Sequence, residues 1–445
     1  MKGTSGPETV STTLQRIAEL ARRAPGMAFT TLAHNIDIDF LREAYRRTRK
    51  DGAAGVDGQT AADYAGSLEG NLGALLEGLK SGRYQAPPVR RVHIPKGDGT
   101  KTRAIGIPTF EDKVLQRAVT MVLEAVYEQD FLDCSYGFRP GRSAHQALQA
   151  LWDGMMEMAG GWVLEVDIQS FFDSLDHGQL RGFLDQRVRD GVVRRAIDKW
   201  LKAGVMEEGE VVHMEWGTPQ GGVVSPLLAN VYLHEVLDKW FESEVKPRLK
   251  GRGFLIRYAD DFVVVLSSES DARRVMDVLP KRFGRYGLTL HPEKTRLVPF
   301  QRPSGGTPST KAEPGSFELL GLTHHWAKSL RGRWFVRRKT TPSRFGRALR
   351  RVGEWCRVNR HLPVAIQQQG LAQKLRGHYG YFDIIGNAVA LGRFYYEVKR
   401  VWRQWLDRRS QRAKMTWPRF QKLLKRYPLP QPVVVHRVYR SAANP

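Results

Sequence analysis

Residues 254–266 read FLIRYADDFVVVL, in which two apolar runs flank a pair of adjacent aspartates. The runs at 254–257 and 262–266 have the composition of strands, which predicts a hairpin with Asp260 and Asp261 at its tip. Two neighbouring carboxylates on a tight turn repel each other, and burying both is costly unless a cation is present. Because an Asp-Asp pair is also a common turn signal, this stretch alone leaves a structural role and a metal-binding role open.

A third carboxylate ends another predicted strand. Residues 163–168 read VLEVDI, a run with the composition of a buried strand, and they deliver Asp167. Carboxylates from neighbouring strands suit two Mg²⁺ ions about 3.5–4 Å apart, the arrangement used for in-line phosphoryl transfer. One ion would lower the pKa of an attacking 3′-hydroxyl, and the other would hold a triphosphate and its leaving pyrophosphate. Two Mg²⁺ ions are therefore the expected cofactors.

A glycine-rich segment lies between the two carboxylate strands. Residues 217–228 read GTPQGGVVSPLL, in which Ser225 is a natural helix cap and Pro226 a natural first helical residue. The glycines before the helix allow a substrate to approach the backbone closely, and Gln220 is placed to reach a nucleotide. A glycine-rich helix start is by itself weak evidence for a nucleotide-binding segment. Its position between the two carboxylate strands makes this evidence specific.

A second hairpin is predicted at residues 92–105, which read VHIPKGDGTKTRAI. The glycines and the aspartate between its two runs are typical turn residues. If the turn centres on residues 98–99, the side chains of Lys96, Lys101 and Arg103 project from one face of the hairpin.

The composition restricts the class of protein. With 445 residues, 41% of them hydrophobic, the chain can bury a sizeable core and is not wholly disordered. Its two cysteines, Cys134 and Cys356, are too few for a disulfide scaffold or a zinc-bound nuclease module. Since no run of 18 apolar residues and no signal-peptide pattern occur, we expect no membrane segment and an intracellular, cytoplasmic location.

The positive charge is concentrated at one end of the chain. The net charge is +24, and residues 321–445 hold 28 basic and 4 acidic residues, whereas residues 1–320 hold 42 of each. A balanced body with a strongly basic C-terminal segment is typical of a protein that binds nucleic acid. A surface tuned only for solubility would mix both signs along the whole chain.

The remaining pattern divides the chain into segments. Residues 1–28 are predicted to form a flexible tail, and strands alternate with helices between residues 161 and 300. Short strands are predicted at 317–323 and 333–338. Three helices with apolar periodicity follow, at about 342–358, 364–384 and 388–409. The short gaps between these helices predict an antiparallel bundle.

Three motifs resemble those of reverse transcriptases in their order and spacing: DIQSFF at 167–172, PQGG at 219–222 and YADD at 258–261. The combination of FFDSLDH at 171–177 with residues 217–230 resembles the branch encoded by group II introns, the intron maturase–reverse transcriptases. The resemblance extends from about residue 30 to the end of the chain. It implies an α+β, right-hand polymerase fold, in which a palm with an antiparallel sheet carries the carboxylates, next to fingers and a three-helix thumb.

The same resemblance implies a division into domains. Residues 29–323 would form the fingers and palm, and residues 324–410 the thumb, or maturase X domain. Residues 411–445 are similar to the family's DNA-binding segment, but they are short and lack the paired cysteines of an HNH nuclease. We therefore expect no cleavage of a second DNA strand, so a primer would come from elsewhere, such as a nascent strand at a replication fork.

The resemblance also implies roles in catalysis for individual residues. Asp167, Asp260 and Asp261 match the family's catalytic, metal-binding triad, to which Ile168 would add its backbone carbonyl. Lys294 matches a lysine proposed to protonate pyrophosphate, with a solvated surface lysine as the alternative.

Further residues match the family's contacts with the incoming nucleotide. Lys96 and Arg103 would hold the triphosphate of a dNTP, and Gln220 would help to position it. Phe172 matches the aromatic gate against a sugar 2′-hydroxyl, which selects dNTP over NTP. Core packing is the alternative for this ring.

The basic C-terminal segment supplies the expected nucleic-acid contacts. Leu320 and Gly321 resemble the primer grip, where glycine permits close approach of the primer end. Beyond them, arginine and lysine side chains suit RNA phosphates, since structured RNA is held largely through phosphate, shape and 2′-hydroxyl groups. The candidates are Arg337, Arg338, Lys339, Arg347, Arg350, Arg351, Lys374, Arg376 and His378. An apolar stripe expected to be buried consists of Leu371, Leu375, Tyr379 and Phe382.

The implied function is RNA-directed DNA polymerisation from a primer 3′-hydroxyl, with an RNA template, a DNA primer or target and dNTPs as partners. The chain would also bind group II intron RNA as a splicing maturase and support intron mobility. One alternative is a domesticated relative that works in host defence or DNA repair. Another is a maturase without polymerase activity, which the intact carboxylates disfavour. The oligomeric state stays open.

Overall fold

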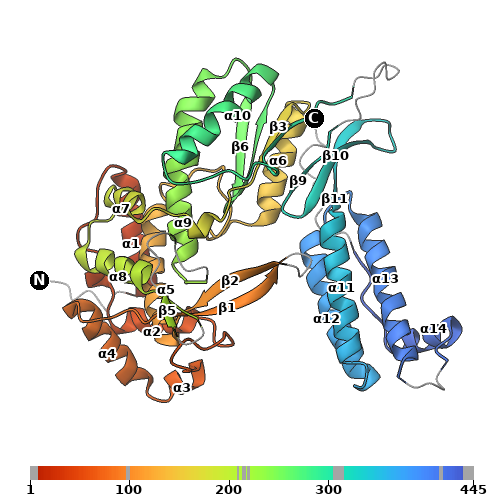
Figure 1. Ribbon diagram of the computed structural model, residues 1–445, viewed down its shortest axis with the longest axis horizontal. Helices are drawn as coiled ribbons and strands as arrows, with labels where there is room; N and C mark the ends of the chain where they lie inside the picture. The colour runs from red at the N-terminus through yellow and green to blue at the C-terminus, as the bar shows by residue number, and fades with distance from the viewer. Residues whose placement is uncertain are drawn as a thin grey trace, which may run out of the picture. The chain divides into compact units, whose positions relative to one another are not determined.

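The computed structural model describes residues 9–96, 101–207, 210–212, 217, 221–303, 315–409 and 414–433. The chain divides into two compact units, each of mixed helix and sheet (Figure 1). Unit 1 comprises Met1–Ala150 and Leu164–Leu297, and unit 2 comprises Leu151–Val163 and Val298–Pro445. Among the described residues, no helix is both long enough and apolar enough to cross a membrane.

The helical part of unit 1 is built around α5 (Phe110–Tyr127), whose residues are buried on nearly every side. A helix that is buried on most of its circumference lies in a core rather than on a surface. Accordingly, α1 (Val10–Arg23) and α2 (Ile38–Arg47) pack against it. The neighbouring short elements are η1 (Ala33–Asn35), α3 (Ala61–Ala65) and α4 (Leu68–Ser81).

The helix α1 shows that the predicted flexible tail at residues 1–28 is wrong over most of its length. Ile17 and Ala21 are buried in this helix, which packs against α5. The buried Arg187 fixes the end of the segment, because its Nη1 donates a hydrogen bond of 2.7 Å to the carbonyl of Met27. Residues 1–8 lie outside the described part of the chain.

A first sheet confirms the second predicted hairpin. Its strands are β1 (Val89–Lys96), β2 (Lys101–Ile107), β4 (Val205–Glu207) and β5 (Glu210–Val212), in the order β2-β1-β4-β5. The antiparallel register pairs residue 94 with residue 103 and residue 96 with residue 101, so positions 96, 101 and 103 share one face, as predicted. The turn at 97–100 lies outside the described residues.

A second sheet carries the first predicted hairpin. Its strands are β3 (Trp162–Val166), β6 (Gly253–Tyr258), β7 (Asp261–Leu266) and β8 (Arg296–Pro299), in the order β6-β7-β3-β8. β6 and β7 are antiparallel, and Tyr258 pairs with Asp261, so the turn consists of Ala259 and Asp260. Phe262 to Leu266 are almost fully buried, and α10 (Glu269–Gly284) packs on this strand. The sheet order therefore sets the turn beside the end of β3.

The helices between these strands complete unit 1. α9 (Ser225–Leu233) continues directly into two π-helical segments, η3 (His234–Asp238) and η4 (Phe241–Val245). Such π-helical turns are rare and occur often at functional sites. The other elements here are η2 (Phe171–Asp173), α7 (His177–Asp185), α8 (Gly191–Lys202) and η5 (Lys246–Arg248). The helix α6 (Ala144–Glu157) precedes β3, and its second half belongs to unit 2.

Unit 2 contains the sheet β11-β10-β9, formed by β9 (Phe317–Leu319), β10 (Leu322–Lys328) and β11 (Trp334–Thr340). The predicted domain boundary between residues 323 and 324 therefore falls inside β10, whereas the units divide at Val298. Residues 151–163 belong to unit 2 because they bond to it: Trp152 Nε1 donates to the carbonyl of Val336 at 2.9 Å.

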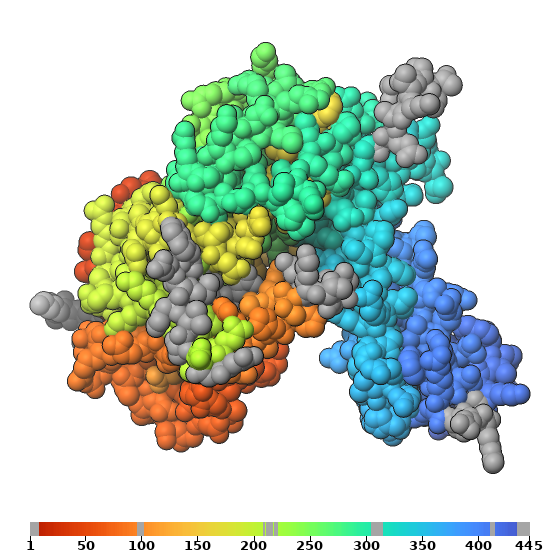
Figure 2. All heavy atoms as spheres, in the orientation of Figure 1, coloured from red at the N-terminus to blue at the C-terminus, as the bar shows by residue number. Residues whose placement is uncertain are grey.

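The predicted bundle helices are confirmed within two residues. They are α11 (Pro342–Val358), α12 (Val364–Phe382) and α13 (Ala388–Asp407), and the predicted apolar stripe of α12 is buried. A further helix, α14 (Trp417–Arg426), occupies part of the predicted tail at 411–445. Its Phe420 is fully buried against Trp402, with ring centroids 5.6 Å apart, so α14 packs on α13 (Figure 2).

Candidate active site

The three predicted carboxylates come from neighbouring strands of the second sheet. Asp167 directly follows β3 and is half-buried, Asp260 lies half-buried in the turn, and Asp261 begins β7 and is exposed. Burial raises the pKa of Asp260, and the negative charge of Asp167 raises it further, while Arg103 acts in the opposite direction. Asp167 and Asp260 are therefore close enough for their charges to interact.

A lysine already neutralises one of these carboxylates. Lys294 Nζ donates to Asp167 Oδ2 at 2.7 Å, although the lysine side chain is exposed. Among the described residues, no three acidic, histidine or cysteine side chains lie at the spacing of a preformed metal site. The oxygen donors themselves are of the kind that Mg²⁺ prefers, and a divalent cation would offset the charge repulsion at Asp260. The donor chemistry of these residues thus fits a divalent cation.

The turn that carries Asp260 is strained and tightly packed. Ala259 has a φ of 57°, in the left-handed region, which costs a residue with a Cβ roughly 1–2 kcal/mol. Gly137 lies directly against it: a Cβ at this glycine would stand 2.3 Å from the backbone nitrogen of Ala259. Only a glycine fits there, so the loop at 134–139 and the turn form one packed unit.

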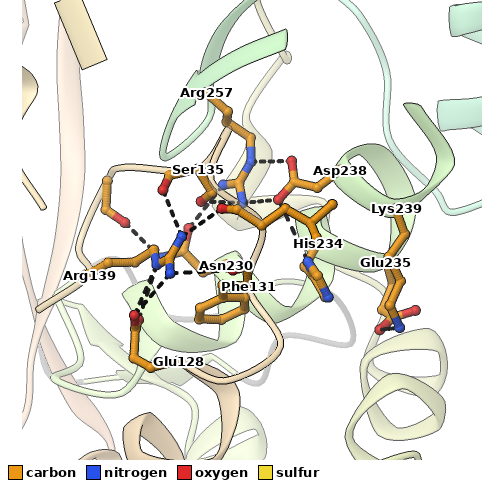
Figure 3. Close-up of polar contacts among 12 residues, drawn as sticks. Glu128, Phe131, Ser135, Arg139, Asn230, His234, Glu235, Asp238, Lys239 and Arg257 are labelled. Carbon is orange, nitrogen blue, oxygen red and sulfur yellow. Dashed lines mark hydrogen bonds and ion pairs between the residues drawn. The ribbon is translucent and has the colours of Figure 1, made fainter. Parts of the chain in front are cut away.

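A buried guanidinium, that of Arg257, is bonded to the turn and to its surroundings (Figure 3). Arg257 has no exposed surface, and its Nε and Nη2 donate to the two carboxylate oxygens of Asp238 at 2.8 and 2.5 Å. Nη1 donates to the carbonyl of Ala259 at 3.0 Å and to Asn230 Oδ1 at 2.9 Å. Nη2 also donates to Ser135 Oγ at 2.7 Å. One side chain therefore connects the turn to η3, α9 and the 134–139 loop.

A second arginine fixes the 134–139 loop. Arg139 is buried, forms a bidentate pair with Glu128 and donates to the carbonyls of Leu132 and Ser135, each at 2.8 Å (Figure 3). Bidentate pairs of this kind combine charge with fixed geometry. Because Asn230 Nδ2 also donates to the Gly137 carbonyl at 2.7 Å, the loop is held at several points.

His234 lies beside this network without joining it. Its Nδ1 is 3.9 Å from Asp238 Oδ2, and neither ring nitrogen has a hydrogen-bond partner among the described residues. Burial lowers the pKa of His234 to about 3, so the ring is neutral at pH 7 and no ion pair forms. Its ring packs edge-on against Phe131, with centroids 5.4 Å apart. The cation that balances Asp238 is therefore Arg257.

The glycine-rich segment is held at both ends. His177 Nε2 bonds to the carbonyl of Gly217 at 2.5 Å, and Gln116 Oε1 accepts from the backbone nitrogen of Val223 at 2.7 Å. Residues 218–220, and with them the predicted nucleotide contact Gln220, lie outside the described residues. Ser225 is the first residue of α9 rather than its cap, since Val224 occupies the cap position.

The structure describes the positions of some of the other residues predicted to contact the nucleotide. Arg103 is exposed on β2, and its charge reaches Asp260; the side chain of Lys96 lies outside the described residues. Ile168, the expected backbone ligand, is buried and directly follows Asp167. Phe172 is half-buried with its ring 5.4 Å from that of Phe171, which fits a gate and a packing role alike.

The predicted primer grip forms a tight turn in unit 2. Leu320 and Gly321 both have positive φ values, 53° and 77°. The carbonyl of Leu320 accepts a hydrogen bond of 2.9 Å from the Tyr381 hydroxyl of α12, and Thr341 donates to the carbonyl of Gly321 at 3.1 Å. The turn is thus fixed to the helical bundle within unit 2.

The positions of two predicted RNA contacts, Arg338 and His378, do not favour that role. Exposure alternates from one residue to the next along β11. Arg338 is buried because its side chain lies on the inward face of this strand. His378 stacks on Phe394 with ring centroids 3.8 Å apart, and burial lowers its pKa to about 4, so it is an uncharged packing residue at pH 7. Exposed or half-exposed positions are those of Arg337, Lys339, Arg347, Arg350, Arg351, Lys374 and Arg376.

The residues that support the turn were not predicted from the sequence. Arg257 is a charged residue within the apolar run at 254–257, and a buried arginine needs a partner. That signal could have identified Arg257 itself. Its partners could not have been identified, since Ser135, Asn230 and Asp238 come from distant segments and have ordinary neighbours in the sequence.

Comparisons with known proteins agree with this geometry. Residues 94–324, just over half of the chain, match the family model described as reverse transcriptase (RNA-dependent DNA polymerase). The chain is 39% identical to the group II intron-encoded protein LtrA of Lactococcus lactis subsp. cremoris over 229 residues, 51% of this chain and 38% of that protein. It is 33% identical to Protein YkfC of Escherichia coli (strain K12) over 330 residues, 65% of this chain and 84% of that protein.

A plant protein extends the comparison to maturases. The chain is 26% identical to Nuclear intron maturase 2, mitochondrial, of Arabidopsis thaliana over 239 residues, 44% of this chain and 30% of that protein. The alignments thus cover less than half the length of the Lactococcus and Arabidopsis relatives. The matched family model includes both carboxylate strands and the glycine-rich segment between them. On this evidence the chain belongs to the reverse transcriptase family, and part of it is similar to group II intron-encoded and intron maturase proteins.

Proposed function

We propose that this chain is the RNA-directed DNA polymerase of a group II intron, which extends a primer 3′-hydroxyl with dNTPs on an RNA template. The observation that carries the proposal is the adjacency of β3 and β7, which brings Asp167 to the turn with Asp260 and Asp261. The same chain would bind intron RNA as a splicing maturase, for which the basic residues of unit 2 provide the phosphate contacts.

Reverse transcriptases use divalent metal ions, and we propose two Mg²⁺ ions at this site. Asp167, Asp260 and Asp261 would hold them, with the carbonyl of Ile168 as an additional ligand. The bound ions would stabilise the charge that develops on the transferring phosphoryl group. Lys294, which neutralises Asp167 here at 2.7 Å, would then be released toward the pyrophosphate as a proton donor.

The remaining residues of the site would select and orient the dNTP. Arg103 lies on the exposed face of β2, with Lys96 and Lys101 at neighbouring positions of the same face, so this hairpin suits a triphosphate. Phe172 would exclude a 2′-hydroxyl by the bulk of its ring. Gln220 would contact the nucleotide from the glycine-rich segment.

In a right-hand polymerase fold, unit 1 would supply the fingers and palm, and unit 2 would supply the thumb and maturase region. The helices α11, α12 and α13 support the thumb assignment. α14 and the residues after it would form the DNA-binding segment, since Arg419, Lys422 and Lys425 are exposed on this helix. The division at Val298 gives the proposal a boundary to test by limited proteolysis.

Primer extension tests the proposal directly. We expect the wild-type chain to extend a DNA primer on an RNA template with Mg²⁺ and dNTPs, and Asp260→Asn to abolish extension while it leaves RNA binding intact. Asp277→Asn, an exposed aspartate on α10, is the matched control and should extend as the wild type does. Tight intron RNA binding without any extension by the wild type would instead identify a maturase that lacks polymerase activity.

A further inference from the structure

Phe138 combines two unfavourable features in one residue. Its side chain is 55% exposed, although a phenylalanine gains free energy by leaving water. Its φ is 55°, in the left-handed region that disfavours any residue with a Cβ. A glycine at this position would avoid both costs, so the ring itself requires an explanation.

The loop around Phe138 is rigid, so this conformation is imposed. Gly137 packs on the nitrogen of Ala259, and its carbonyl accepts a hydrogen bond from Asn230. On the other side, Arg139 is tied to Glu128 and to two backbone carbonyls. With both neighbours fixed, Phe138 cannot relax into a common backbone region, and its ring is presented outward from a fixed base.

The ring stands beside the candidate active site. Its centroid lies 6.5 Å from that of Tyr258, at an interplanar angle of 41°. Tyr258 begins the turn that carries Asp260, so the exposed ring is next to the place where a primer terminus must meet the carboxylates. Aromatic rings exposed at such places are typical platforms for nucleotides.

We propose that Phe138 is a nucleic-acid-binding residue whose ring packs on the base or sugar of a nucleotide of the primer–template held at the turn. This inference rests on the proposed polymerase function. A ring on a preorganised backbone loses little conformational entropy on contact with a ligand, so a rigid, strained loop is a suitable support for it. Stacking of this kind changes affinity by roughly fivefold to 150-fold per base.

Substitution by glycine separates the structural and functional roles of the ring. Phe138→Gly relieves the backbone strain, so its Tm should equal that of the wild type or exceed it by up to about 4 °C. The same variant should bind a labelled RNA–DNA primer–template at least about fivefold more weakly and show a raised KM for it. The KM for dNTP should not change. Phe138→Trp should restore the affinity.

A matched control removes the effect of a new glycine. Ala159 is another non-glycine residue with a left-handed φ, 56°, and it belongs to unit 2. Ala159→Gly should leave both primer–template affinity and extension at the wild-type level. Single abasic nucleotides, placed in turn in the primer and in the template, then identify the strand that the ring contacts. The difference in affinity between the wild type and Phe138→Gly should disappear where the contacted base is missing. If the ring contacts the sugar instead, the difference should persist at every position.

Wild-type affinity in Phe138→Gly would overturn the inference. So would a lower Tm with weak binding that Phe138→Trp does not rescue, because the ring would then serve only the packing of the loop. The binding measurement needs no turnover. An absence of extension by the wild type would therefore contradict the proposed polymerase function and leave the comparison of affinities valid.

Discussion

At the scale of single residues, the site depends on side chains that never contact a substrate. Arg257 reaches the carbonyl of Ala259 and both oxygens of Asp238 from a position without exposed surface. Burial opposes its charge, and the Asp238 carboxylate more than compensates, so the pKa of Arg257 is raised. A lysine could not reproduce this geometry, since it lacks the planar fork of donors.

Arg257→Lys should therefore impair the turn more than the fold. We expect the Mg²⁺ concentration for half-maximal extension to rise and kcat to fall by about 100-fold, because the turn with Asp260 loses its fixed position. Arg257→Met combined with Asp238→Leu removes both buried charges and should keep a Tm near that of the wild type. Normal Mg²⁺ dependence and normal kcat in this double variant would show that the ion pair serves stability alone.

At the scale of elements, long-range contacts explain what the sequence pattern did not predict. The hairpin with Asp260 and the bundle helices follow from local composition, so they could be predicted to within a few residues. α1 was missed because its buried stripe consists only of Thr13, Ile17 and Ala21, and because its anchor, Arg187, lies more than 150 residues away in the sequence. The burial of His378 was missed for a related reason, since the partner ring belongs to a different helix, α13.

Arg187 anchors the end of α1, so its removal should loosen this helix. Arg187 is buried, pairs with Asp130 at 2.8 Å and donates to the carbonyls of Ala21, Ala24 and Met27. Arg187→Ala should lower the stability of unit 1 by about 3–5 kcal/mol, since it leaves the half-buried Asp130 and three backbone carbonyls without their partner. Hydrogen exchange should increase first in Val10–Arg23. Unchanged protection of this helix would mean that its apolar contacts with α5 suffice.

A buried carboxyl on α5 gives a pH dependence. Burial raises the pKa of Asp112 to about 7; Asp57 also raises it, whereas its hydrogen bonds lower it. Its neighbours are Tyr84, whose hydroxyl donates to it, and Trp200, which donates to Tyr84 at 2.8 Å. Because the folded state binds this proton more tightly than the unfolded state, the stabilisation is present at acidic pH and is lost as the pH rises from about 4 to 7.

Asp112→Asn should remove this contribution. Relative to the variant, the wild type should lose about 2–4 kcal/mol of unfolding free energy between pH 5 and pH 8. Chemical denaturation at several pH values measures the difference. A constant difference between the two proteins across this range would show that Asp112 is already ionised in the folded state.

At the scale of the whole molecule, charge and function are unequally distributed. The carboxylates that would perform chemistry belong to unit 1, whereas the excess of 24 positive charges lies in residues 321–445. Charge of this kind acts through phosphates and counterion release, so it sets affinity and its salt dependence rather than sequence preference.

Four exposed cations of unit 2 provide the test: Lys339, Arg350, Arg351 and Arg376. Their combined replacement by glutamine should weaken RNA binding and make the slope of log K against log salt shallower by up to about 3. The matched control removes four cations of unit 1 that are paired with glutamates: Lys239, Lys246, Arg248 and Arg273. Equal losses in both variants would mean that net charge matters and the location does not.

Unit 2 is assembled from two separate stretches of chain, and this has a consequence during synthesis. Val298 leaves the ribosome 135 residues after Val163, a delay of roughly 7–27 s at 5–20 residues per second. For that time the nascent segment at 151–163, which later bonds to Val336 through Trp152, has no folded neighbour of its own unit. We therefore expect a ribosome-associated chaperone to shield this part of the nascent chain. Slower translation should increase aggregation, because the segment then stays without its partners for longer.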